Sequence, residues 1–360
     1  MRSNSQLFIN FAVFYKLSTM KKRIKKRHLR LAVICLLGII GVTYYYLFSS
    51  LSNQDKTTYI YIDEDDDIDS VTTKLSAIAH TQPLFAYSTL ARHSNYEEKI
   101  RTGRYSIKPG DGALTVFRHL KNGMQTPLNL TIPTVRTIDR FSAEMGKKLM
   151  LDSIDLYNML TDSAVCRKYG YDTTTIISMF IPNTYDIYWN VSLDKFLDRM
   201  KRECDNFWNI NRQGKAKQMG LTPVEVTTLA SIIDEETANN EEKPMIAGMY
   251  LNRLKKQMPL QADPTIKFAL KRFELRRIYN NLLATESPYN TYKHAGLPPG
   301  PIRIPTVAGI DAVLNHVEHD YLYMCAKEDF SGTHNFARTY QEHLENAARY
   351  SKALNERGIK

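Results

Sequence analysis

The chain has 360 residues, of which 43% are hydrophobic and 24% charged, a globular composition with enough length for two domains. The formal net charge is +10, but residues 1–30 carry nine Lys/Arg and no Asp or Glu, which leaves 39 basic against 38 acidic residues beyond them. Because the body is nearly neutral, it offers no basic stripe to a phosphate backbone, and nucleic acid is excluded as a partner.

Residues 29–48, L-R-L-A-V-I-C-L-L-G-I-I-G-V-T-Y-Y-Y-L-F, predict a transmembrane helix. Their length matches the ~20 apolar residues that cross a bilayer. Tyrosines 44–46 suit an aromatic belt, and the basic cluster at the other end predicts that residues 1–28 are a cytoplasmic tail. A cleaved signal peptide is the alternative, but the apolar run is long for one and no small-x-small site follows it. We therefore expect a single-pass anchor with the N-terminus inside.

Met20 directly precedes the basic stretch K-K-R-I-K-K-R. Translation therefore starts either at Met1 or at Met20, and the sequence does not distinguish between the two.

A small α+β module is predicted after a polar stalk at residues 49–58. Residues 59–62 read as a strand, and the D-E-D-D-D run then caps a helix from about Ile68, where acidic side chains suit the helix dipole. Residues 103–132 read as strand, helix and returning strand. We assign residues 59–132 to this module and residues 133–360 to a larger, helix-rich α+β domain.

The four cysteines do not predict a disulfide framework or a zinc site, because none forms a C-x-x-C pair and Cys35 lies in the apolar segment. There is also no H-E-x-x-H motif. We expect neither a metal nor another cofactor.

Residues 222–237, T-P-V-E-V-T-T-L-A-S-I-I-D-E-E-T, predict a helix. Thr222 suits the cap, Pro223 suits the first turn, and Glu225 completes a capping box. One apolar face is marked by four side chains: Val226, Leu229, Ala230 and Ile233.

The three carboxylates at the end of this helix differ in direction. With Val226 at zero and 100° per residue, Glu235 falls at about 180° in water, Asp234 at about 80° at the edge of the apolar face, and Glu236 at about 280° among apolar residues. A carboxyl in apolar surroundings has a raised pKa, which a general acid needs. The alternative is that Glu236 only ends the helix and pairs with Arg253 or a lysine.

A second helix is predicted by apolar residues at i, i+3, i+4 and i+7: Ala247, Tyr250, Leu251 and Leu254. The polar loop M-P-L-Q-A-D-P-T follows, and S-P-Y-N-T-Y-K-H-A-G-L-P-P-G-P-I lies at residues 287–302. Aromatic and amide side chains on a proline-fixed loop suit stacking on sugar rings. A rigid loop with only a structural role is the alternative.

Four stretches in one order over more than 100 residues make the sequence resemble the endolytic murein transglycosylases, the MltG/YceG-like family. They are A-S-I-I-D-E-E-T (230–237), N-R-L-x5-L-Q-A-D-P-T (252–265), the 287–302 stretch, and D-Y-L-Y followed by G-T-H-N-F (320–336). The resemblance extends from the anchor to about residue 350. It implies that the small module is LysM-like and that the larger domain is catalytic.

The resemblance implies a lytic transglycosylase, a lyase that cleaves the bond between N-acetylmuramic acid and N-acetylglucosamine in peptidoglycan. The family's catalytic glutamate is the one before Thr in its E-x-E-T motif, which is Glu236 here. It protonates the leaving oxygen and then accepts the muramoyl C6 hydroxyl proton, which closes a 1,6-anhydro ring. Asp234 replaces the first Glu of the motif, and we expect no loss of activity from that change.

Further residues are assigned by the matched stretches to substrate binding. Arg253 is expected to contact lactyl or peptide carboxylates or to pair with Glu235, and His334 of G-T-H-N-F is either a substrate contact or structural. Asp263 contacts substrate or caps the turn before Pro264. The remaining expected contacts are Asn252, Gln261, Thr265, Tyr289, Asn290, Tyr292 and, in the F-I-P-N-T-Y loop, Tyr185.

Two alternatives to this function remain open. A muramidase-type hydrolase would need a second carboxyl at about 5–9.5 Å from the first, for which Asp263 is the candidate. A non-catalytic glycan-binding scaffold of cell-wall synthesis is the other. In the main interpretation the enzyme lies in the cytoplasmic (inner) membrane with its catalytic domain in the periplasm, limits the elongation of nascent glycan strands, and has peptidoglycan synthases as further partners.

Overall fold

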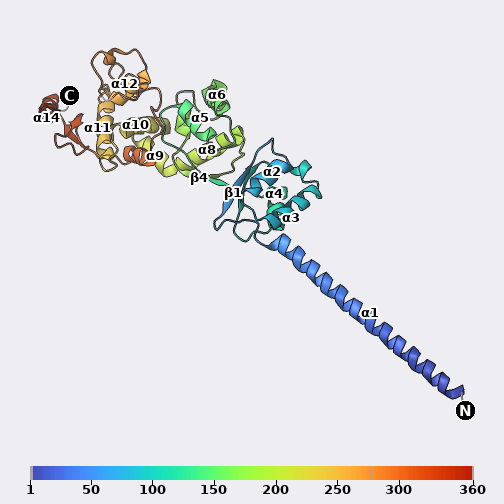
Figure 1. The fold of residues 1–360 in the computed structure, drawn as a ribbon. Coiled ribbons are helices and arrows are strands. Elements are labelled where there is room, and N and C mark those ends of the chain that lie inside the picture. The colour runs from blue at the N-terminus through green and yellow to red at the C-terminus, as the bar shows by residue number, and fades with distance from the viewer. Residues whose placement is uncertain (1–2, 276, 359–360) are drawn as a thin grey trace. The chain divides into compact units, whose positions relative to one another are not determined.

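The computed structural model describes residues 3–275 and 277–358 and divides into two compact units, Met1–Pro127 and Leu128–Lys360. Each unit has its own hydrophobic core. Helices dominate, and the strands of the described residues form three two-stranded sheets (Figure 1). The predicted helix-rich α+β class is therefore confirmed.

Unit 1 begins with one unbroken helix, α1 (Ser3–Phe48) (Figure 1). Its part Tyr15–Phe48 is long and apolar enough to cross a membrane, and its apolar stretch is not buried by the protein. At the C-terminal end Tyr46 packs against the core of unit 1, with its ring 6.4 Å from that of Phe85. A signal sequence meets the same criteria of length and composition.

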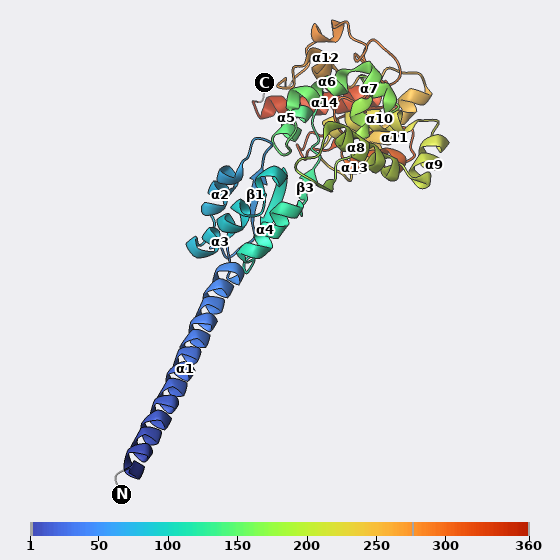
Figure 2. The same cartoon turned by 90° about the vertical axis from the view of Figure 1, so that its right-hand side faces the viewer.

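The rest of unit 1 is an antiparallel two-stranded sheet with helices packed around it (Figure 2). Asp67 caps α2 in a capping box with Ser70, as the acidic run predicted. The elements are β1 (Thr58–Ile62), α2 (Ile68–Ser76), α3 (Thr81–Arg92), η1 (Glu97–Lys99), β2 (Gly103–Ile107) and α4 (Ala113–Asn122).

The predicted polar stalk at residues 49–58 is only partly present. Leu51 is fully buried in the core of unit 1. Its N–H donates to the Asp111 carbonyl at 2.8 Å, and its own carbonyl accepts from the His80 N–H at 2.8 Å. The apolar Leu51 side chain thus attaches the start of the predicted stalk to unit 1. Residues 53–57 remain exposed.

The returning strand predicted within residues 103–132 belongs to unit 2 instead. This strand, β3 (Leu128–Thr131), pairs antiparallel with β4 (Thr184–Ile187) and not with β2, whose partner is β1. Leu130 and Ile132 are buried in the core of unit 2. Unit 1 therefore ends at Pro127, and the predicted boundary at residue 132 is wrong by this strand.

Unit 2 is built mainly from helices. Between β3 and β4 lie α5 (Ile138–Gly146), α6 (Ser153–Thr161), α7 (Ser163–Lys168) and η2 (Ile176–Met179). After β4 come α8 (Leu193–Phe207), α9 (Ile210–Gln218), α10 (Pro223–Glu236), α11 (Lys243–Lys255), α12 (Asp263–Leu270), η3 (Leu282–Ala284), α13 (Val307–Leu314), the hairpin β5 (Tyr323–Ala326) and β6 (His334–Ala337), and α14 (Tyr340–Glu356).

The central helix of unit 2 is α10. Its predicted capping box is present, since the Glu225 N–H donates to Thr222 Oγ1 at 3.2 Å and the Thr222 N–H donates to Glu225 Oε2 at 2.7 Å. Helices α9, α11, α12 and α13 all contact α10, and residues 226–233 are buried without exception. The predicted solvent face is therefore absent, because neighbouring helices surround α10.

Candidate active site

Glu236 is the last residue of α10, and its Oε1 accepts a hydrogen bond of 2.7 Å from the Tyr250 hydroxyl of α11. Burial raises the pKa of the Glu236 carboxyl to about 7, against the hydrogen bond from Tyr250, which lowers it. The negative charge of Asp263 also raises this pKa, whereas His334 and Lys267 lower it. A carboxyl poised near neutrality can give a proton and take one back, as general acid–base catalysis requires.

Tyr250 is a functional candidate that the sequence did not reveal. Its apolar spacing predicted a core residue, and its side chain is indeed only 2% exposed. Burial, followed by the charge of Glu236, raises the pKa of Tyr250 well above 10, so its hydroxyl stays a donor. No motif links positions 236 and 250, which meet only because α11 packs against α10.

Replacement of Tyr250 by Phe should raise the pKa of Glu236 further, because the lost hydrogen bond had lowered it. A hydrogen bond to a charged group is worth about 1.5–3 kcal/mol, so a rate loss of roughly 10- to 100-fold is expected from poorer positioning. The pH profile of glycan cleavage measures both, and its alkaline limb should move to higher pH. Tyr105→Phe, which removes a hydroxyl bonded to the Arg101 carbonyl in unit 1, is the matched control and should leave the profile unchanged. An unmoved limb in Y250F would contradict the prediction.

Asp263 is the first residue of α12 and accepts a hydrogen bond from the Tyr292 hydroxyl at 2.5 Å. The turn-capping alternative is wrong, because Ala262 holds the cap position and makes no side-chain cap bond. Asp263 is exposed, and its charge acts on Glu236. Lys267 follows four residues later, so both lie on one face of α12. This spacing is a sequence signal that could have identified Lys267.

His334, at the start of β6, is held by Glu242. Its N–H donates to Glu242 Oε1 at 2.6 Å, and its Nδ1 lies 3.0 Å from Glu242 Oε2. Glu242 is buried and directly precedes α11. The cap residue of α11 thus holds His334 and its body carries Tyr250, and both side chains lower the pKa of Glu236.

Asn252 and Arg253 hold the surrounding loops together. The Asn252 amide donates to the carbonyl of His319 at 2.6 Å and to that of Tyr321 at 3.1 Å. The buried Arg253 guanidinium donates to four oxygens: the carbonyl oxygens of Leu322, Pro259 and Leu260, and the side-chain Oε1 of Gln261. Both side chains thus bond to neighbouring loops. The predicted pairing of Arg253 with Glu235 is wrong, because Glu235 pairs with Arg136 and Arg303.

Thr265 and Asn290 are fully buried. Thr265 Oγ1 donates to the Ala262 carbonyl at 2.7 Å, and the Asn290 amide donates to the carbonyls of Leu283 and Thr285. Thr265 thus fixes the start of α12 and Asn290 fixes its loop, and neither buried side chain faces a ligand.

Tyr185, Gln261 and Tyr289 occupy three different environments. Tyr185 lies in the core on β4, where its hydroxyl donates to the Ile181 carbonyl at 2.9 Å. Gln261 is exposed, with a backbone φ of 51° in the left-handed region. Tyr289 packs on the Phe268 ring at 4.7 Å and lines a cavity. The structure therefore removes Tyr185 from the set of expected sugar contacts.

The helical wheel put Asp234 at the edge of the apolar face and Glu235 in water, and its placement of Glu235 is wrong. Asp234 is almost completely buried and forms an ion pair with Lys243 at 2.7 Å. Glu235 is not in water, since its carboxylate accepts two hydrogen bonds from Arg136 and one from Arg303. A helical wheel describes only the isolated helix. It cannot predict ion pairs with cations from other segments of the chain.

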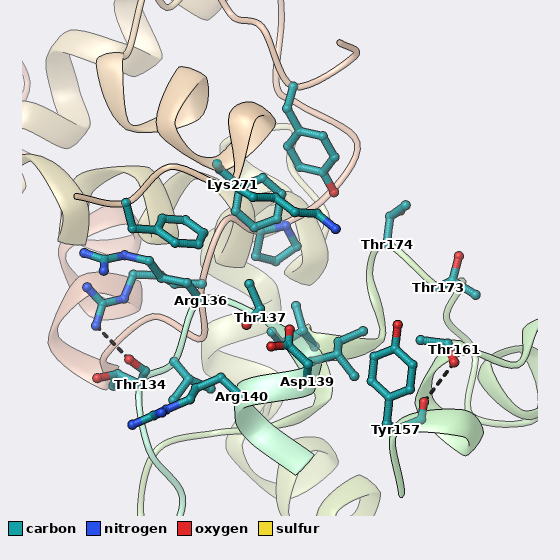
Figure 3. A pocket seen from close by; sticks show the side chains of 18 residues that line it. Thr134, Arg136, Thr137, Asp139, Arg140, Tyr157, Thr161, Thr173, Thr174 and Lys271 are labelled. Carbon is teal, nitrogen blue, oxygen red and sulfur yellow. Dashed lines mark hydrogen bonds between the residues drawn. The ribbon is translucent and has the colours of Figure 1, made fainter. Parts of the chain in front are cut away.

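A cavity of 1060 Å³ in unit 2 lies apart from Glu236, which is not among its lining residues. Figure 3 shows Arg136 and Arg140 on one side of it, and Tyr157, Thr161 and Thr173 on the other. A narrower cavity shares Arg136, Phe268 and Phe273 with it and is also lined by Glu235 and Lys267, neighbours of Glu236.

The fold and site thus define a helix-rich α+β protein with one candidate acid–base carboxyl at the end of a buried helix. The chain belongs to the YceG-like family, whose model matches residues 60–349.

Relatives and a solved structure agree with this membership. The chain is 25% identical over 357 residues to an endolytic murein transglycosylase of Streptococcus pneumoniae strain R6, covering 89% of this chain and 63% of that relative. It is 34% identical over 168 residues to an endolytic murein transglycosylase of Bacillus subtilis, covering 47% and 46% of the two chains. A crystal structure of a YceG-like protein from Listeria monocytogenes matches with a TM-score of 0.53 and 24% identity, over 81% of this chain and 99% of that one, and shows the shared fold.

Proposed function

We propose that this protein is an endolytic lytic transglycosylase of peptidoglycan, which cleaves between N-acetylmuramic acid and N-acetylglucosamine within nascent strands. The observation that carries the proposal is Glu236, a partly buried residue of the E-E-T segment whose carboxyl has its pKa raised to about 7 by desolvation. The names of the pneumococcal and Bacillus relatives, endolytic murein transglycosylase, support it.

In the proposed reaction, protonated Glu236 donates its proton to the glycosidic oxygen as the bond to the muramoyl C1 breaks. The resulting carboxylate then accepts the proton of the muramoyl C6 hydroxyl, whose oxygen bonds to C1 and closes a 1,6-anhydro ring. Water is not consumed, and Glu236 is protonated again at the end. Tyr250 keeps Oε1 fixed through both proton transfers, and the charge of Asp263 stabilises the positive charge that develops at C1.

A muramidase-type hydrolase is the second candidate, favoured by the presence of Asp263 beside Glu236. Asp263→Asn separates the two. In a transglycosylase the variant should keep anhydro products with a rate lowered by roughly 10- to 100-fold, because it loses only electrostatic stabilisation. In a hydrolase that uses Asp263 as nucleophile or base, it should lose nearly all cleavage.

The experiment that tests the function is digestion of purified glycan strands by the full-length protein in detergent micelles, with the products identified by mass spectrometry. Fragments lighter by one water than hydrolysed ones, and cut internally, are expected. Reducing-end products would instead establish the hydrolase, and tight glycan binding without cleavage would establish a non-catalytic scaffold.

The same proposal covers the location of the enzyme. We take residues 29–48 of α1 as an uncleaved anchor, with the basic tail of residues 1–28 in the cytoplasm and the catalytic unit in the periplasm, supported by the positive-inside rule. We take unit 1 after α1 as the LysM-like module, supported by its compact α+β core. An enzyme placed there can limit the length of strands as synthases extend them.

A further inference from the structure

The 1060 Å³ cavity of unit 2 has a cationic lining that the chemistry at Glu236 does not use. Among the residues that the structure describes, four cationic side chains and one carboxylate, that of Asp139, line it; the cations are Arg136, Arg140, Lys271 and Arg303. A cavity for neutral sugars has no need of such an excess of positive charge. Its size is sufficient for a ligand of several residues.

The four cationic side chains differ in whether a carboxylate of the protein already pairs with them. Arg136 and Arg303 share one counter-charge, Glu235. Arg140 is 64% exposed and lies 3.2 Å from Glu144. Lys271 is exposed, and its ammonium group has no hydrogen-bond or ion-pair partner among residues 3–275 and 277–358. In Figure 3 its amine end is directed toward the side of the cavity that carries Thr174.

Lys271 also has an unfavourable backbone conformation. It ends α12 with a φ of 53°, in the left-handed region where Gly or Asn is usual. This conformation closes the helix, because the Lys271 N–H donates to the Phe268 carbonyl at 3.0 Å and the Arg272 N–H donates to the Lys267 carbonyl at 2.9 Å. The backbone of Lys271 thus caps α12 while its side chain lines the cavity.

The other lining groups suit a peptide. Hydroxyls of Thr137 and Thr173 can bond to peptide amides, and the rings of Phe268, Phe273 and Tyr289 offer apolar surface to short side chains. The cavity shares Arg136, Phe268 and Phe273 with a second cavity of about 30 Å³, which is also lined by Lys267, whose charge acts on Glu236.

We propose that this cavity binds the short acidic peptide that branches from the muramoyl lactyl group of the strand cut at Glu236, with Lys271 and Arg140 as the carboxylate contacts. The inference rests on the proposed function for its choice of peptide. It makes the enzyme selective for strands that still carry their peptides.

A binding measurement tests this without any need for cleavage. The full-length protein in detergent micelles is titrated into a fluorescein-labelled pentapeptide, L-Ala-γ-D-Glu-L-Lys-D-Ala-D-Ala, and into the same peptide with both carboxylates amidated. Fluorescence anisotropy should show at least tenfold weaker binding of the amidated peptide, and weaker binding of the acidic one at higher salt.

Three variants locate the binding. Lys271→Gly removes the charge at a φ that glycine accepts, so it should weaken binding of the acidic peptide by about fivefold to tenfold without lowering Tm. Lys271→Arg should restore binding. Lys217→Ala, which removes an exposed lysine of α9, should change the Kd by no more than about twofold.

Equal binding of the acidic and amidated peptides, or equal effects of K271G and K217A, would overturn the inference. Peptide binding with the expected pattern, in a protein that cuts no glycan, would uphold the cavity assignment while refuting the proposed reaction.

Discussion

Replacement of Glu236 by Gln is expected to lower the rate of glycan cleavage by about 10²–10⁴-fold, since the amide keeps the shape of the carboxyl but cannot donate and recover a proton. The hydrogen bond from Tyr250 can persist to the amide oxygen, so the geometry of the site is kept. Mass spectrometry of digested strands measures the loss. Glu345→Gln, an exposed change on α14, is the matched control and should keep full activity.

The same substitution should stabilise the protein at alkaline pH. The pKa of Glu236 rises from 4.5 to about 7 on folding, so the native state binds the proton more tightly than the unfolded state. The stability linked to this group is complete below pH 4.5 and is lost as pH rises through 7. The neutral Gln avoids that loss, and E236Q should therefore exceed the wild type by about 1–3 kcal/mol at pH 8.

Chemical denaturation at pH 4 and pH 8 checks this, with equal stabilities expected at pH 4. An inactive E236Q that is no more stable at pH 8 would show that the carboxyl is not held in a desolvated state. The wild-type cleavage rate should itself fall as pH rises above about 7, because the acid form of Glu236 disappears.

Replacement of Lys243 by Met should destabilise unit 2 by about 3–5 kcal/mol, because it leaves the Asp234 carboxylate buried without a counter-charge. The two side chains are 4% and 2% exposed and lie 2.7 Å apart. Asp234 also accepts from the Thr306 N–H and hydroxyl, which fixes the start of α13. The denaturation midpoint measures the loss.

Two controls accompany this variant. Lys168→Met breaks an exposed pair with Asp194 and should cost less than about 1 kcal/mol. In the double variant K243M/D234N the buried charge is removed as well, and a clear recovery of stability is expected. A double variant as unstable as K243M would mean that lost packing, and not an unpaired charge, causes the effect.

Sequence reasoning selected Glu236 from local signals, and its catalytic role stays a prediction. The helical period fixes its direction on α10, and the capping box at Thr222 fixes where that period begins. The same locality explains why β1, β2, α2 and α4 were found near their predicted places.

Local sequence patterns could not predict which strands pair. The partner of a strand depends on which distant residues form the core around it. The strand at 128–131 has the same local pattern whether it pairs with β2 or β4, and only the core around Leu130 and Ile132 decides.

The rest of the site depends on tertiary contacts. The helical wheel put Glu235 in water and Asp234 at the edge of the apolar face. Lys243, Arg136 and Arg303 come from three other segments and neutralise both carboxylates. By itself the sequence determined the membrane-length helix, the helix-rich α+β class and the candidate carboxyl. Only the packing of distant segments decided which hydroxyl holds that carboxyl and where a cationic cavity forms, because hydrogen bonds and ion pairs depend on distances in space that spacing along the chain does not set.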